Sequence, residues 1–484
     1  MSDERRRGVE YSKVEDDYLN NRSLQGGSVG WVLLAGLGVA YVISGDFAGW
    51  NFGLDEGGFG GLLIATVLMA VMYTCMVLGL AELASAIPVA GAGYGFARRA
   101  LGPLGGFATG TAILIEYAIA PAAIVVFING YVQALGLFGL TVGTAGWPVY
   151  LACYAIFVGV HLYGVGEALK LIFVITAAAV VALVLFVIVM IPKFDPGNLT
   201  DIAVDTSALG SSSFLPFGIA GVLAAFVYGI WFFLAIEGVP LAAEEARDPK
   251  KDMPRGIIAA MLALLVFAAL ILVLAPGAGG SEAIRASDNP LPLALRQAYD
   301  GPTWMADFVN YVGLLGLVAS FFSIIYGYSR LLFALSRAGY LPRTLALTGK
   351  RKTPWVALIV PATIGFLLAA ITENGALLIN IAVFGATVSY VLMMVSHIVL
   401  RRREPDLERP YRTPGGTATT GVALALACLA VVATFFVDIL AAGITAAVFA
   451  AFLAYFWFWS RHRLVGVAPE EEFDAISSAE SELS

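Results

Sequence analysis

Long apolar runs, separated by short polar segments, occupy most of the chain. A helix crosses the hydrocarbon core of a bilayer with about 20 residues, and each run is long enough to do so. Twelve such runs are present, at 29–54, 58–87, 103–137, 146–164, 166–192, 214–243, 255–276, 304–338, 353–372, 376–400, 417–439 and 441–461. The pattern predicts an all-α polytopic membrane protein with twelve transmembrane helices.

Basic residues collect in alternate loops between these runs. They follow the second, sixth, eighth and tenth runs and precede the first, whereas only Lys193, Arg285 and Arg296 lie in the other loops. Because Lys and Arg are enriched on the cytoplasmic side of a membrane, both termini are expected in the cytoplasm. The expected location is a bacterial-type plasma or inner membrane, with the lipid bilayer as a partner.

Composition agrees with a membrane protein and gives no sign of an enzyme. Hydrophobic residues make up 59% of the chain and charged residues 13%, against roughly 45–50% and 25% in soluble domains. The three cysteines fall in apolar runs and predict no disulfide framework or metal cluster. "GAGYGF" (Gly91 to Phe96) lacks the strand and Lys-Ser or Lys-Thr of a phosphate loop, so we expect a close-packed loop there. We expect no catalytic activity, no cofactor and no nucleic-acid partner.

Two of the runs contain helix-breaking residues at related places. The first run is interrupted by Ser44 and Gly45, and the sixth carries Gly229, Gly238 and Pro240. Corresponding interruptions five helices apart are typical of transporters built from inverted repeats, which bind substrate near the bilayer midplane where both helices unwind. The freed backbone groups need polar partners there, so the two interruptions predict a polar cavity.

Four segments carry a resemblance to a known family. "ISGDFAGWN", "AELASAIPVAGAGYGFARRALGP", "AIEGVPLAAEEARDPKKDMPRGI" and "SRLLFALSRAGYLP" resemble the amino acid, polyamine and organocation permeases over nearly all of the chain. "VISGDFAGWNFGL" with "ILIEYAIAPAAIVVFI" is similar, more narrowly, to the bacterial ethanolamine permease branch. The resemblance implies a five-plus-five inverted repeat with broken helices one and six. The implied divisions are a cytoplasmic segment 1–28, a transport core 29–400, helices eleven and twelve over 401–464, and an acidic cytoplasmic tail 465–484.

One departure from the family pattern concerns the substrate. Amino-acid carriers of this family hold the substrate carboxylate at the first break, where this chain has Asp46. An aspartate would repel a carboxylate and attract a cation, and a buried charge needs a partner. By alignment with the family, Glu116 and Tyr117 fall at positions that line the substrate cavity, and Glu237 in the sixth run is a third acid, at a place where the family commonly has a glutamate. A gating or proton-sensing role is an alternative for Glu237, and a structural, protonated carboxyl is an alternative for all three acids. The expected substrate-binding residues are Ser44, Gly45, Asp46, Phe47, Glu116, Tyr117, Tyr228, Trp231, Phe232 and Glu237.

These residues favour a small alkylammonium substrate, because the apolar runs contain few basic residues to balance the acids. We expect a secondary transporter that imports such a cation by alternating access, with ethanolamine first among the candidates. The alternatives are an amino-acid permease or exchanger, and a membrane nutrient sensor with a carrier fold. Ser320 and Ser323 form a possible ion site, whereas Ala179 stands where sodium-independent relatives carry a lysine. Coupling to H⁺ and coupling to Na⁺ both remain open.

Overall fold

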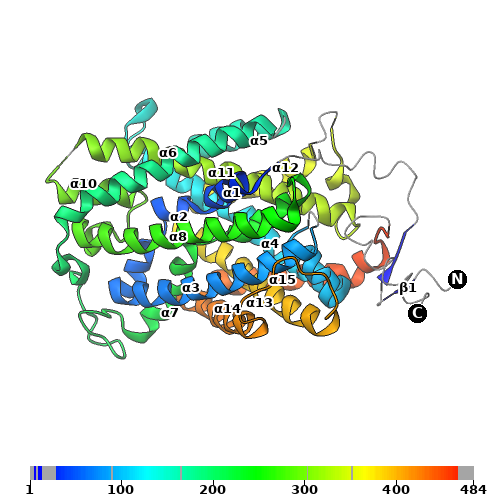
Figure 1. Cartoon of the computed structure of the whole chain (residues 1–484). Helices are drawn as coiled ribbons and strands as arrows, with labels where there is room; N and C mark the ends of the chain where they lie inside the picture. The colour runs from blue at the N-terminus through cyan, green and yellow to red at the C-terminus, as the bar shows by residue number, and fades with distance from the viewer. Residues whose placement is uncertain are drawn as a thin grey trace.

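The computed structural model describes residues 5–6, 9–12, 29–88, 91–163, 166–301, 303–349 and 353–466. The cytoplasmic segment and the acidic tail predicted over 1–28 and 465–484 lie largely outside these ranges. Within them the chain is almost entirely helical, and its helices run side by side in one bundle (Figure 1). The expectation of an all-α polytopic protein is confirmed.

The described residues contain ten helical segments that are long and apolar enough to cross a membrane. They fall on α3 (Phe52–Ala86), α4 (Gly93–Ala134), α6 (Gly166–Met190), α7 (Gly218–Trp231) with its continuation η5 (Ile236–Glu245), α8 (Pro249–Gly279), α11 (Trp304–Arg337), α12 (Trp355–Thr372), α13 (Gly375–Arg403), α14 (Thr417–Val437) and α15 (Ile439–Phe458). Two shorter apolar helices are α1 (Trp31–Val42) and α5 (Trp147–Tyr163). The count of twelve spans and the inverted repeat stay predictions.

Short elements connect these helices. They are α2 (Ser44–Phe47), α9 (Ser281–Ile284), α10 (Pro290–Ala298) and the 3-10 turns η2 (Leu137–Gly139), η3 (Ile191–Lys193), η4 (Pro196–Thr200), η6 (Arg343–Ala346) and η7 (Ser460–His462). Two-residue strands β1 (Arg5–Arg6) and β2 (Val9–Glu10) pair antiparallel. They lie at one end of the bundle, with α10 at the other end (Figure 1). The chain after β2 also pairs with the segment after η7, through Tyr11 and Leu464.

Two helix starts differ from the sequence prediction. α4 begins at Gly93 rather than near residue 103, so most of "GAGYGF" is helical and the expected loop is wrong there. α3 begins at Phe52 rather than near residue 58. The apolar runs were bounded by polar residues, but a helix continues through them when it kinks. Gly102 and Gly58 supply these kinks, with φ of 82° and 64°, values that glycine adopts without penalty.

α4 forms the centre of the bundle. It packs against α11 and α13, and 89% of its apolar span is buried, whereas the corresponding figure for α15 is 22%. Side chains on α4 therefore face protein in almost every direction. Polar residues on this helix, Glu116 and Tyr117 among them, must find their partners inside the protein or in a bound molecule.

Candidate substrate site at two interrupted helices

The first interruption is held open by a hydroxyl group from another helix. In an unbroken helix the Ala40 carbonyl would accept from the Ser44 N–H. Instead, the Ser320 hydroxyl of α11 lies between them, donating to the Ala40 carbonyl over 2.7 Å and accepting from the Ser44 N–H over 2.9 Å. A side chain inserted into the backbone ladder is a known cause of helix breaks. The hydrogen-bond ladder is therefore interrupted at Ser44, where the sequence predicts it, whereas the backbone leaves the helical conformation only at Ala48, with φ of −159° and ψ of 160°.

The hydroxyl groups of the possible ion site are both bonded to backbone carbonyls. Ser320 donates to Ala40, and Ser323 donates to the Ala319 carbonyl over 2.8 Å within α11. A cation bound by these oxygens would need both hydroxyl hydrogens to turn away from the carbonyls. The ion site stays a prediction.

The two interrupted helices touch at Gly45. A methyl group built at Gly45 would overlap the backbone carbonyl of Trp231, the last residue of α7. The Trp231 indole N–H in turn donates to the Ala48 carbonyl over 2.9 Å, and the indole lies against Gly49, whose φ is 95°. The sequence predicts that the interruptions of the first and sixth runs lie next to each other, and Gly45 and Trp231 are in direct contact there.

The second interruption is the turn between α7 and η5. Its last residue, Ala235, has φ of 75° and ψ of 7°, a left-handed conformation that costs about 1–2 kcal/mol in a residue with a side chain. Of the three residues expected to interrupt this run, only Gly229 lies inside the regular helix, whereas Gly238 and Pro240 lie in the 3-10 segment that follows the interruption. Gly229 is needed for packing instead, because a Cβ there would lie 3.0 Å from the Thr66 nitrogen.

Glu237, just after the second interruption, is surrounded by tyrosine hydroxyl groups. Tyr117 of α4 donates to one carboxyl oxygen over 3.1 Å, and Tyr390 of α13 donates to the other over 3.2 Å. The Tyr390 hydroxyl also lies 2.9 Å from that of Tyr73 of α3. All four side chains are buried. This cluster joins four separate segments of the bundle through one carboxyl group.

Glu116 faces the same carboxyl group. It is completely buried, its oxygens have no hydrogen-bond partner among the described residues, and it adjoins Tyr117, which donates to Glu237. Two carboxyl groups can bond each other only when one of them holds a proton, since an ionised carboxylate is an acceptor only. The pair therefore forms a natural position for a proton between α4 and η5.

Asp46 forms a separate acidic centre. It lies in α2, is completely buried, and neither of its carboxyl oxygens has a hydrogen-bond partner among the described residues. A buried carboxylate without a donor or a cation is strongly unfavourable. Asp46 therefore requires a proton, an ion or a cationic molecule as its partner.

The other predicted substrate residues are spread around the interruptions. Phe47 points at α11, where its ring covers two glycines. Tyr228 packs on Phe52, with ring centres 6.2 Å apart, and Phe232 stacks on Trp50 at 5.5 Å. The rings continue into two chains of contacts, from Tyr228 through Phe52 and Phe127 to Trp231, and from Phe232 through Phe233 to Tyr73. Their roles in substrate binding stay predictions.

A second buried carboxyl cluster closes the end of the bundle that is expected to be cytoplasmic. Glu82 of α3 is paired with Arg401 at 2.5 Å, with Arg409 at 3.1 Å and with His397 at 3.4 Å, and it accepts from the Thr413 N–H over 2.6 Å. Arg409 and Thr413 belong to the loop between α13 and α14. This one carboxylate therefore fastens that loop to α3.

At the opposite end, Asn51 fastens the segment after the first interruption. Its amide nitrogen donates to the carbonyls of Ile284 and Ser287 over 2.8 and 2.9 Å and lies 3.2 Å from that of Arg285, and its oxygen accepts from the Gly49 N–H over 3.1 Å. α9 and the chain after it are thereby tied to the interrupted helix.

Sequence reasoning missed several of these residues. Tyr73, Tyr390, Glu82 and Asn51 were not singled out, and Ser320 was considered only as an ion ligand. Two of them could have been found from their positions: the carboxamide of Asn51 and the carboxylate of Glu82 are polar groups near the ends of apolar runs. The tyrosines give no such signal, because tyrosine is common in buried helices.

Two apolar helices that are interrupted where they meet, beside buried carboxyl groups and inside a bundle of membrane-spanning helices, define a membrane transport protein. The amino-acid sequence identifies the class more narrowly. Residues 31–464 match the model of the amino acid permease family. The chain belongs to this family.

Curated relatives share the family over most of their length. A branched-chain amino acid permease of Bacillus subtilis is 30% identical, with 76% of this chain and 79% of the relative aligned. A methylthioribose transporter of the same organism is 27% identical, over 73% of this chain and 76% of the relative. An uncharacterized transporter of Rhizobium meliloti is 29% identical, with 82% of this chain and 84% of the relative aligned.

Proposed function

We propose that this protein is a secondary transporter that imports a small alkylammonium compound, ethanolamine first among the candidates, by alternating access. The observation that carries the proposal is the pair of unbonded acids beside the interruptions. Asp46 and Glu116 are completely buried, and no described residue donates to either carboxyl group. A bound ammonium group would satisfy such a carboxylate by hydrogen bonds and charge together.

The backbone at the first interruption supports a cation over a carboxylate. A substrate carboxylate would need free N–H groups there. Two of the nearby amides already have acceptors, since the Ser44 N–H bonds the Ser320 hydroxyl and the Asp46 N–H bonds the Ile43 carbonyl. Asp46 adds a charge of the wrong sign for a carboxylate. An amine without a carboxylate fits both features.

The Glu116–Glu237 pair favours the proton as the coupling ion. When no ammonium group is bound at Glu116, one proton shared by these two buried carboxyl groups holds α4 to η5 at the second interruption. Its loss would place two like charges together in a buried site, which is strongly unfavourable. Proton release would therefore loosen this contact, which couples protonation to the position of the interrupted helix.

Uptake by purified protein in liposomes tests the substrate. We expect labelled ethanolamine to accumulate and unlabelled ethanolamine to compete better than choline, alanine, leucine or glutamate. Asp46→Asn is expected to weaken ethanolamine affinity at least tenfold, in line with the loss of a buried charge-assisted bond of about 1.5–3 kcal/mol. Unchanged affinity in both Asp46→Asn and Glu116→Gln would mean that the carboxyl groups are structural.

The same liposomes test the coupling ion when pH and sodium are varied independently. Uptake driven by an inward pH gradient, and lost in Glu116→Gln, supports the proton. Uptake that depends on a sodium gradient and is lost in Ser323→Ala supports the possible ion site, because Ser323 bonds only a carbonyl of its own helix.

The second candidate is an amino-acid permease or exchanger. It is favoured by the family and by the relative whose name assigns it branched-chain amino acids. Accumulation of leucine without accumulation of ethanolamine would establish this alternative and overturn the cation proposal. If none of these compounds is taken up, the result would favour the other alternative, a membrane nutrient sensor with a carrier fold.

A further inference from the structure

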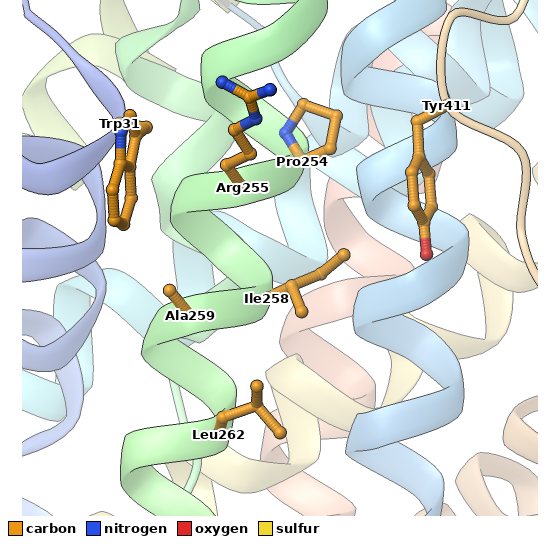
Figure 2. Close-up of a pocket in the computed structure, with 7 residues that line it drawn as sticks. All are labelled: Trp31, Pro254, Arg255, Ile258, Ala259, Leu262 and Tyr411. Carbon is orange, nitrogen blue, oxygen red and sulfur yellow. The ribbon is translucent and has the colours of Figure 1, made fainter.

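A groove opens on the outer surface of the bundle beside the first helix. Its volume is about 340 Å³, and it lies between the start of α1 and the first turns of α8, with the loop between α13 and α14 on the other side. Figure 2 shows Trp31 and Tyr411 on either side of the residues from α8. The lining residues are Trp31, Pro254, Arg255, Ile258, Ala259, Leu262 and Tyr411.

The length of the groove is apolar and runs along α8, one of the helices long and apolar enough to cross a membrane. Ile258, Ala259 and Leu262 form one face of α8, and Leu262 is 59% exposed. Trp31 is 42% exposed. An exposed apolar groove along a membrane-spanning helix suits a hydrocarbon chain better than a water-soluble ligand.

The end of the groove nearest the loops carries a positive charge. Arg255 is exposed, and among the described residues it has no hydrogen bond or ion pair. Two neighbouring cations differ in this respect, because Lys250 is paired with Glu408 at 3.1 Å and Lys251 with Asp248 at 3.2 Å. The guanidinium of Arg255 is therefore available to an anion at the rim of the groove.

We propose that this groove binds a phospholipid with an anionic headgroup. One acyl chain lies along Ile258, Ala259 and Leu262, and Arg255 holds the phosphate of the headgroup. The planar guanidinium matches a phosphate with paired hydrogen bonds. Trp31 and Tyr411 occupy the interface between membrane and water, where such aromatic rings are enriched.

The position of the groove gives the lipid a structural effect. Trp31 starts α1, the helix that leads to the interruption at Ser44, and α1 lies close to α8 where a Cβ at Gly256 would be 2.7 Å from that of Leu34. A lipid that contacts both helices and the loop stabilises α1 in this position. Anionic lipid should therefore raise the thermal stability of this conformation.

Lipid retention by the full-length protein tests the proposal. The purified protein is equilibrated with phosphatidylcholine alone or mixed with phosphatidylglycerol, and retained lipids are identified by native mass spectrometry. We expect preferential retention of phosphatidylglycerol and a rise in melting temperature with it. Arg255→Gln should weaken the retention about fivefold, the effect of one basic residue at an anionic membrane surface.

Matched variants separate this site from general charge effects. Arg402→Gln removes another exposed arginine outside the groove and should leave retention unchanged. Ala259→Trp fills the groove, keeps Arg255 and should also reduce retention. The proposal is overturned if Arg255→Gln and Arg402→Gln behave alike, if phosphatidylcholine is retained equally well, or if glycerol phosphate without acyl chains displaces the lipid.

Discussion

Replacing Ser320 by alanine would test how the first interruption is maintained. The variant removes the hydroxyl that separates the Ala40 carbonyl from the Ser44 N–H. All three residues are buried, so water does not replace the lost bonds. The two backbone groups could bond each other only if α2 turned relative to α1. The contact between Gly45 and the Trp231 carbonyl blocks that rotation.

The expected loss follows from the two orphaned groups. A buried polar group without a partner costs about 1–3 kcal/mol. Because hydrogen bonds in membrane proteins fall at the lower end of such ranges, we expect Ser320→Ala to lower the free energy of unfolding by about 2–4 kcal/mol. Ser320→Thr keeps the hydroxyl and should recover most of this loss.

The measurement is unfolding of the purified protein in mixed micelles by added dodecyl sulfate. Ser323→Ala is the matched control on α11, because its hydroxyl bonds a carbonyl of its own helix. Such bonds contribute little to helix stability, so the control should lose less than about 1 kcal/mol. Equal losses in Ser320→Ala and Ser323→Ala would refute the assigned role of Ser320.

Three further variants probe other parts of the structure. Gly45→Ala should abolish uptake, because its methyl group would overlap the Trp231 carbonyl, whereas Gly159→Ala has open space and should transport normally; normal uptake in both would contradict the close crossing. Glu82→Gln should destabilise the protein by about 2 kcal/mol, because the partly exposed Arg401 and Arg409 lose a charged hydrogen-bond partner, and a change under a tenth of that by the same micelle titration would argue against the cluster. Burial raises the pKa of Asp288 to about 6, so this group favours the folded state below pH 4 and loses that contribution as pH rises through 6. Asp288→Asn should therefore raise the melting temperature at pH 7.5 but not at pH 4, and equal effects at both values would contradict the raised pKa.

The membrane-spanning pattern and the first interruption could be predicted from local sequence. Runs of apolar residues and the Ser44–Gly45 pair are read along the chain itself. Whether such a segment forms a helix, and where the helix is interrupted, depends on the hydrophobicity and helix propensity of residues that are neighbours in the sequence. Asp46 was predictable for the same reason, as a formal charge inside an apolar run.

The start of the second interruption, between Trp231 and Ile236, could not be predicted because its position depends on contacts between distant segments. Gly229 and Gly238 are the obvious helix breakers, but Gly229 is used for close packing against α3. The left-handed residue is Ala235, which has no local preference for that conformation. Tyr390 donates to Glu237 from 153 residues away, a contact that no local pattern indicates.

Asn51 gives the end of the bundle near α9 a discrete fastening. Its amide nitrogen lies within bonding distance of three carbonyl oxygens, those of Ile284, Arg285 and Ser287. An amide nitrogen carries only two hydrogens, so these bonds are shared and one acceptor can be lost without release. Arg285 adds a second tie, an ion pair with Asp55 of α3 at 3.3 Å. The chain after the first interruption and the segment around α9 are therefore joined at two points, and neither segment can be displaced without breaking contacts to the other.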